Sequence, residues 1–185
     1  MSPSLAAGRA ARTVATLATL AAVVVAACRA PAVTEVPAQS TGGPMLPVRS
    51  LATPAFDSAV AAFRYNSGVD RRARLVVRSQ AEWATLWAEI TRNVSPVPPV
   101  PVVDFAERMV LVAAMGTRSS GGHAIAVETV DSAGGVLRAS VVERSPGARC
   151  VTTGALTQPL AAVVVPRTAG QVTWAERTAV VDCGP

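Results

Sequence analysis

The N-terminal segment constrains the fold most, because it carries the pattern of an export signal. Such a signal is cleaved from the mature protein and does not form part of the folded domain. Two arginines precede an apolar stretch over residues 14–27. At roughly 1.5 Å per residue this stretch spans about 20 Å as a helix, which is short of a bilayer core of about 30 Å. It ends in Val-Ala-Ala directly before Cys28, which is the pattern of a lipobox. We therefore predict a lipoprotein signal peptide over residues 1–27.

Cys28 is the predicted lipidation site, at which the thiol accepts a diacylglycerol and palmitate-type chains hold the mature protein at a membrane. Two or more acyl chains bind a bilayer stably. Arg29, rather than an aspartate, follows the cysteine, which favours the outer membrane where the cell has one. We expect a protein of the bacterial cell envelope, anchored on the outside of the inner membrane or on the outer membrane.

The rest of the chain divides into a tether and one domain. Residues 28–55 are rich in Pro, Ala, Ser, Thr and Gly without periodicity, as in a flexible tether. Residues 56–185 are enough for one domain with its own core. Without residues 1–27 the chain has 15 basic and 12 acidic side chains, a formal charge of +3. So small an excess predicts no nucleic-acid partner.

Two cysteines remain for the domain once Cys28 carries lipid. Cys150 and Cys183 form an even pair in an oxidising compartment, so a disulfide is the expected arrangement, with two buried free thiols as the alternative. A metal site is not expected, because the chain has one histidine and no second cysteine pair. No cofactor is expected either.

The sequence at the start of the domain predicts a strand followed by a helix. Residues 72–79 alternate with period two and place arginines on one face, which is either a solvated outer face or a basic docking surface. Ser79-Gln80-Ala81-Glu82 then fits a capping box. An apolar stripe at i, i+3, i+4 and i+7 predicts an amphipathic helix over about 80–92 whose tryptophans are core anchors. The stripe consists of Trp83, Leu86, Trp87 and Ile90.

The remainder is rich in strand signals. Residues 108–115 read as a strand buried on both faces, and residues 123–130 and 136–143 as a hairpin around Gly134-Gly135. Residues 160–165 predict a further strand, and residues 171–182 one or two more. The predicted fold is a single strand-rich α+β domain with an antiparallel or mixed sheet and one clear helix.

Catalytic chemistry is not expected. The single histidine, His123, follows Ser119 and Ser120, and Asp104 could complete a triad on paper. The serines do not form a nucleophile elbow, however, since no strand-to-helix turn follows them. An envelope hydrolase that uses these residues is therefore an unfavoured alternative.

The most distinctive local feature is a polar, glycine-rich loop between two strands. Its glycines permit positive φ angles and a close approach of the backbone. The loop is either a long turn at a sheet edge or a surface that presents backbone groups to a partner protein. The loop and its flank comprise Gly116, Thr117, Arg118, Ser119, Ser120, Gly121, Gly122 and His123.

Several short motifs occur in the order of a known family. They are Val103-Asp104-Phe105, the strand 109–115, Gly116 before Gly121-Gly122, Glu143-Arg144-Ser145-Pro146-Gly147, and Thr157-Gln158-Pro159 before a valine-rich strand. In this respect residues 73–182 resemble the C-terminal domain of the PrcB family, lipoproteins described as subunits of a surface protease complex. Two family tyrosines are replaced, by His123 and by Leu160.

The resemblance implies a non-enzymatic accessory domain that holds a protein partner such as a secreted or surface protease. We expect the loop 116–123 at the contact. The alternative is a protease inhibitor, because chagasin-like inhibitors also use Thr/Gly-rich loops at one end of a β-sandwich; that analogy rests on a few residues.

Overall fold

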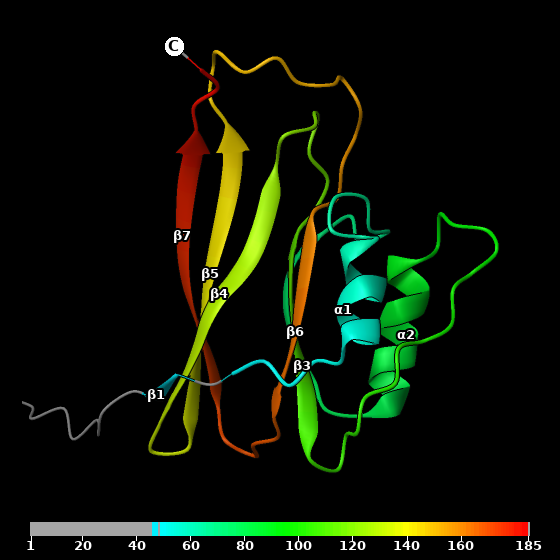
Figure 1. Cartoon of the computed structure of the whole chain (residues 1–185), viewed down its shortest axis with the longest axis vertical. Helices are drawn as coiled ribbons and strands as arrows, with labels where there is room; N and C mark the ends of the chain where they lie inside the picture. The colour runs from blue at the N-terminus through cyan, green and yellow to red at the C-terminus, as the bar shows by residue number, and fades with distance from the viewer. Residues whose placement is uncertain (1–45, 48, 185) are drawn as a thin grey trace, which may run out of the picture. The chain divides into compact units, whose positions relative to one another are not determined.

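A computed structural model describes residues 46–47 and 49–184 (Figure 1). Cys28, the predicted signal peptide and most of the predicted tether lie outside the described residues. The elements in chain order are β1 (Leu46–Pro47), α1 (Pro54–Ala61), β2 (Arg72–Val77), α2 (Gln80–Ile90), β3 (Arg108–Met115), β4 (Ala124–Ala133), β5 (Val136–Pro146), β6 (Leu160–Pro166) and β7 (Val172–Val181).

The strands form two sheets. One has four strands in the order β1-β4-β5-β7, and the other has three in the order β2-β3-β6. Helices α1 and α2 cover one face of the three-stranded sheet, and β4, β5 and β7 face its other side (Figure 1). The prediction of a strand-rich α+β domain is confirmed.

Strand β3 is buried on both faces, as its continuous apolar sequence predicts. Val110, Val112 and Ala114 belong to the core between the helices and the sheet. Met109 and Leu111 belong to the core between the two sheets. Because successive side chains of a strand point to opposite faces, this one strand joins the two cores.

Helix α2 begins as predicted. The Ser79 hydroxyl accepts a hydrogen bond from the Glu82 N–H at 3.3 Å, and the Glu82 carboxylate accepts from the Ser79 N–H at 3.1 Å. Trp83 and Trp87 are fully buried, which confirms their role as core anchors. Their indole N–H groups donate to the carbonyls of Pro101 and Pro98, in the segment between α2 and β3.

Replacing Ser79 with alanine is expected to lower the free energy of unfolding by about 1 kcal/mol, because the helix loses its N-cap acceptor. Urea denaturation followed by circular dichroism measures this loss. Thr85→Ala in the same helix is the control: its exposed hydroxyl donates to a carbonyl within the helix, so we expect a change within about 0.5 kcal/mol. Equal losses in the two variants would show that the capping box contributes nothing.

Helix α1 is an element that sequence reasoning did not predict. Thr53 caps it by accepting from the Phe56 N–H, and Pro54 occupies its first turn. Phe56 and Val60 are buried beneath it, and the Phe56 ring stacks on Trp83. The helix therefore begins two residues before the predicted start of the domain at residue 56.

The hairpin of β4 and β5 is confirmed, with positive φ angles at both Gly134 and Gly135. Strand β6 belongs to the other sheet, so the chain then returns to the first sheet, and β7 pairs with β5 in parallel. The four-stranded sheet is therefore mixed, and residues 172–181 form one strand.

The arginines of β2 differ from both expectations. Their side chains point toward the four-stranded sheet, where Arg72 and Arg74 pair with Glu143 of β5 and Glu176 of β7. This face is thus neither a solvated outer face nor a free basic docking surface. Its arginines link the two sheets by ion pairs.

Candidate functional site

The loop 116–123 connects β3 of one sheet to β4 of the other. It leaves β3 through Gly116, whose φ of +71° lies in the left-handed region. A Cβ atom at this position would come within 2.8 Å of the Asp70 carbonyl oxygen and of the Arg72 nitrogen. The turn therefore requires glycine, both for its backbone angle and for its close approach to the start of β2.

A second loop, residues 147–158, holds the first one in place. Arg118 and Thr157 exchange two backbone hydrogen bonds of 2.8 and 3.0 Å. Gly121 donates its N–H to Thr153, and the Thr157 hydroxyl donates to the Ser120 carbonyl. We refer to residues 116–123 and 147–158 together as the loop face.

These bonds engage part of the backbone that the loop was expected to present to a partner. The N–H groups of Thr117, Arg118 and Gly121 already have backbone acceptors within the domain. A partner of this face would therefore contact side chains and the backbone groups of the loop that these bonds do not use.

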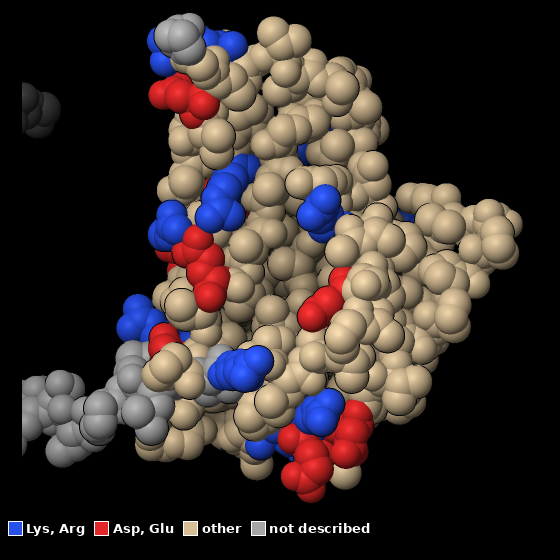
Figure 2. Space-filling view, viewed as in Figure 1, with Lys and Arg blue, Asp and Glu red and all other residues tan. Residues whose placement is uncertain are grey.

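Exposed apolar side chains gather at this end of the domain. Val151 is fully exposed and Leu156 is 66% exposed, both on the second loop. Val180 and Tyr65 are also exposed, the former near the end of β7 and the latter beside the start of β6. The corresponding end in Figure 2 is mostly uncharged, apart from the charges next to the C-terminal end. Apolar groups exposed together are typical of protein contact sites.

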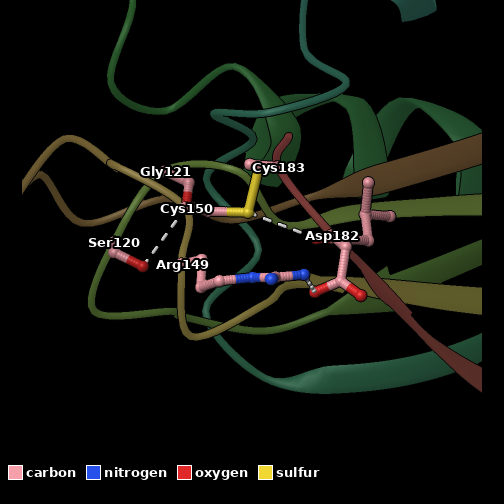
Figure 3. Close-up of a disulfide and its surroundings, with 7 residues drawn as sticks. Ser120, Gly121, Arg149, Cys150, Asp182 and Cys183 are labelled. Carbon is pink, nitrogen blue, oxygen red and sulfur yellow. Dashed lines mark hydrogen bonds and ion pairs between the residues drawn. A yellow bond between two sulfur atoms is a disulfide. The ribbon is translucent and has the colours of Figure 1, made fainter. Parts of the chain in front are cut away.

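The Cys150–Cys183 disulfide ties this face to the end of β7 (Figure 3). The structure thus supports the predicted disulfide over two free thiols. Cys150 is next to Arg149, which pairs with Asp182 beside the second cysteine. The covalent bond therefore fixes the start of the second loop.

A cluster of charged side chains lies behind the loop face, between the two sheets. Glu143 accepts from Arg72 at 2.9 Å and from Arg74 at 2.6 Å, and Arg74 also donates to Glu176. Arg118 of the loop approaches Glu143 at 3.7 Å. Burial alone would raise the pKa of Glu143, but hydrogen bonds and charges from Arg74 and Arg72 lower it below its usual value. Glu143 is therefore ionised at neutral pH.

His123 is the last residue of the loop and is half-buried. Burial lowers the pKa of His123, and the positive charge of Arg118 lowers it further. Its Nδ1 atom is buried and has no hydrogen-bond partner among the described residues. Both observations indicate a neutral imidazole at pH 7.

NMR titration of the single histidine should therefore give a pKa below 6.5. Arg118→Gln removes the neighbouring positive charge, so this variant should raise the pKa without restoring the full value, because burial remains. A wild-type pKa at or above 6.5 would contradict the placement of His123 beside Arg118.

The residues of the hypothetical triad are not brought together. Asp104 precedes β3, whereas Ser120 and His123 follow it, so a strand of eight residues, about 26 Å long, separates the acid from the base. The Ser120 hydroxyl donates to the Gly121 carbonyl.

Within residues 46–47 and 49–184 there is no group of three or more side chains that could hold a metal ion. No helix in the same part of the chain is long and apolar enough to cross a membrane.

Sequence reasoning missed the second half of the loop face. Val151 and Leu156 are apolar residues within a segment of Gly and Thr, which was a usable signal. The sequence around Tyr65 does not indicate that it lies at this end of the domain, because only the fold brings it near residue 158.

Residues 109–166 match the family model described as PrcB C-terminal. This range runs from β3 through β6 and contains both loops of the loop face. The family resemblance is confirmed over a shorter range than residues 73–182. Comparison with curated proteins and with solved structures finds no match.

Proposed function

We propose that this chain, which carries a PrcB C-terminal domain, is a lipid-anchored, non-enzymatic subunit that holds a protease partner at the cell envelope. The PrcB C-terminal match associates the chain with protease complexes. Its anchor, its location and the absence of catalysis are parts of the proposal.

One observation carries the proposal: the loop face combines exposed apolar side chains with a fixed backbone. Val151 and Leu156 are exposed on a segment held by the disulfide and by hydrogen bonds to the first loop. A preorganised surface loses little conformational entropy when a partner binds. Such a surface suits a stable subunit contact.

The predicted lipid anchor fits this role. Between Cys28 and the first described strand, residues 29–45 have a maximum extended length of about 60 Å. A domain on such a tether could bind a large partner beside the membrane without a fixed orientation.

Affinity capture from detergent-solubilised envelopes tests the proposal. We expect the wild-type chain to enrich a protease, identified by mass spectrometry. Leu156→Asp should abolish this enrichment, because it places a charge within the apolar contact. Val102→Asp is the matched control, since Val102 is also exposed but lies before β3, at the opposite end of that strand.

The proposal fails if the wild-type chain enriches no protease, or if both aspartate variants lose the protease enrichment equally.

The lipid anchor has its own test. Cys28→Ser should prevent incorporation of labelled palmitate and release the protein from the membrane fraction, and labelling of the variant would exclude Cys28 as the lipidation site.

Protease inhibition is a second possibility, because both loops lie at one end of the stacked sheets. The hydrogen bonds that hold the first loop against the second favour a flat contact over insertion into a cleft. Titration of the purified chain against a panel of cysteine proteases distinguishes the two, and inhibition at micromolar concentration would favour the inhibitor.

A further inference from the structure

Strand β2 is an edge of the three-stranded sheet, with β3 on one side only. No other strand of the described residues lies along its second side. The opposite edge of this sheet is different, because the Leu51 N–H donates to Val164 in the middle of β6. The edge of β2 is thus available to a further strand.

The register identifies which backbone groups face this edge. Met115 of β3 donates its N–H toward β6, so its neighbour Ala114 faces β2. Ala114 pairs with Ala73. Because alternate residues of a strand present their backbone groups to opposite edges, the remaining positions of β2 point away from β3. They are Arg72, Arg74 and Val76.

Both ends of this edge are closed. At one end the Arg78 N–H donates to the Glu82 carboxylate at 2.8 Å, and the Arg78 carbonyl accepts from Arg167 at 2.7 Å. At the other end Arg71 forms an ion pair with Glu89. The open stretch between these two ends is about the length of a short peptide strand.

A groove runs along this open stretch, between β2 and α2. Its volume is about 500 Å³. Apolar residues from both elements line it, and the charges at its rim are already engaged, Glu89 with Arg71 and Glu82 in the capping box. The apolar lining residues on the helix side of β2 and on α2 are Leu75, Val77, Ala81 and Leu86, and Val76 lines the groove from β2 although its side chain packs between the sheets.

The edge also lacks the charged side chains that usually protect such strands from pairing. Arg72 and Arg74 point toward the other sheet, where Glu143 and Glu176 bind them. The arginines that alternate along β2 therefore do not prevent another strand from approaching.

We propose that β2 and α2 bind an extended, uncharged segment of a partner protein, which adds to β2 as a fourth strand. Its alternate apolar side chains enter the groove. Backbone hydrogen bonds provide affinity, and the groove provides preference for apolar residues at every second position. An uncharged segment suits this groove, because Arg71 and Glu89 neutralise each other and backbone N–H groups already occupy the Glu82 carboxylate. This proposal is independent of the loop face.

Fluorescence anisotropy tests it with the mature chain, residues 28–185, and a fluorescein-labelled peptide amide of sequence Gln-Val-Thr-Val-Thr-Val-Gln, whose side chains carry no charge. We expect saturable binding. Methylation of the peptide's alternate backbone nitrogens that face β2 should weaken binding at least about tenfold, because the donors are lost while every side chain stays. Equal binding of the methylated peptide, or no saturable binding up to about 1 mM, would overturn the proposal.

Two protein variants locate the site. Thr85 lines the groove and is exposed, so Thr85→Trp should fill the groove and weaken binding at least about tenfold. Ala88 is exposed on the same helix outside the groove, and Ala88→Trp should leave the affinity within about twofold. If the two variants change the peptide affinity equally, the peptide does not bind in the groove between β2 and α2, and the proposal is overturned.

Other occupants predict different results. If deletion of residues 29–45 strengthens peptide binding about tenfold, the chain's own N-terminal segment occupies the groove. If the wild type sediments as a dimer and Thr85→Trp as a monomer, a second copy occupies it. Either result overturns the proposal of a partner strand.

Discussion

Replacing Glu143 with glutamine should lower the free energy of unfolding by about 3 kcal/mol, because a buried ion pair is broken from one side. The Glu143 and Arg74 side chains are each only 10% exposed. The amide keeps the shape of the carboxylate but leaves Arg72 and Arg74 without its negative charge. Urea denaturation at pH 7 measures the loss.

The loss should depend on pH in a defined direction. The pKa of Glu143 in the folded protein lies below its ordinary value of 4.5, so the ionised carboxylate stabilises the fold above that value. This stability is lost as the pH falls through the folded-state pKa. The difference between wild type and Glu143→Gln should therefore be constant at neutral pH and narrow below about pH 4.5.

Glu128→Gln provides a matched control. Glu128 of β4 also pairs with two arginines, Arg144 and Arg177, but this cluster lies on the exposed side of the sheet. Exposed ion pairs contribute little, so we expect a much smaller loss of unfolding free energy than for Glu143→Gln. Equal losses for the two variants would contradict a role for Glu143 in linking the sheets.

Removing the disulfide is the second change with a large expected effect. Cys150 and Cys183 are 33 positions apart, and on the chain-entropy model a loop of this length contributes about 3–4 kcal/mol. The double variant Cys150→Ser, Cys183→Ser should lose about this amount in urea denaturation. Reduction of the wild type should produce the same loss.

The same variant should disturb the loop face more than the core. Without the disulfide, the start of the loop 147–158 keeps only weaker contacts, such as the Arg149–Asp182 pair. Amide hydrogen exchange should therefore accelerate at Gly121 and Thr157, while β3 stays protected. Uniform acceleration throughout the domain would show that the disulfide supports the whole fold and not this face in particular.

The parts of the fold that sequence predicted are those with local signals. The capping box at Ser79, the stripe that includes Trp83, and the glycine pair at Gly134-Gly135 each act within a few residues. The interactions that form these features involve residues close together in the sequence, so the sequence pattern predicts them correctly. The signal for α1, Thr53 before Pro54, was also local but lay inside a segment interpreted as tether.

The parts that sequence did not predict depend on distant residues. The alternation of residues in β2 predicted a strand but did not show which of its faces is buried against the other sheet. The partner that decides this, Glu143, is about 70 positions away from the arginines that it binds. The parallel pairing of β5 and β7 likewise requires β6 to join the other sheet first. The loop face requires Arg118 and Thr157 of its two loops to pair at one end of the domain, which no pattern along the chain encodes.

Site-specific photo-crosslinking in intact cells tests the central claim, that the loop face holds a protein partner, most directly. A photoreactive residue replaces Leu156 in one strain and Val102, which is 86% exposed, in another. Our account predicts a discrete crosslinked product with a protease from position 156 and none from position 102. The same products from both positions, or none from position 156, would contradict it.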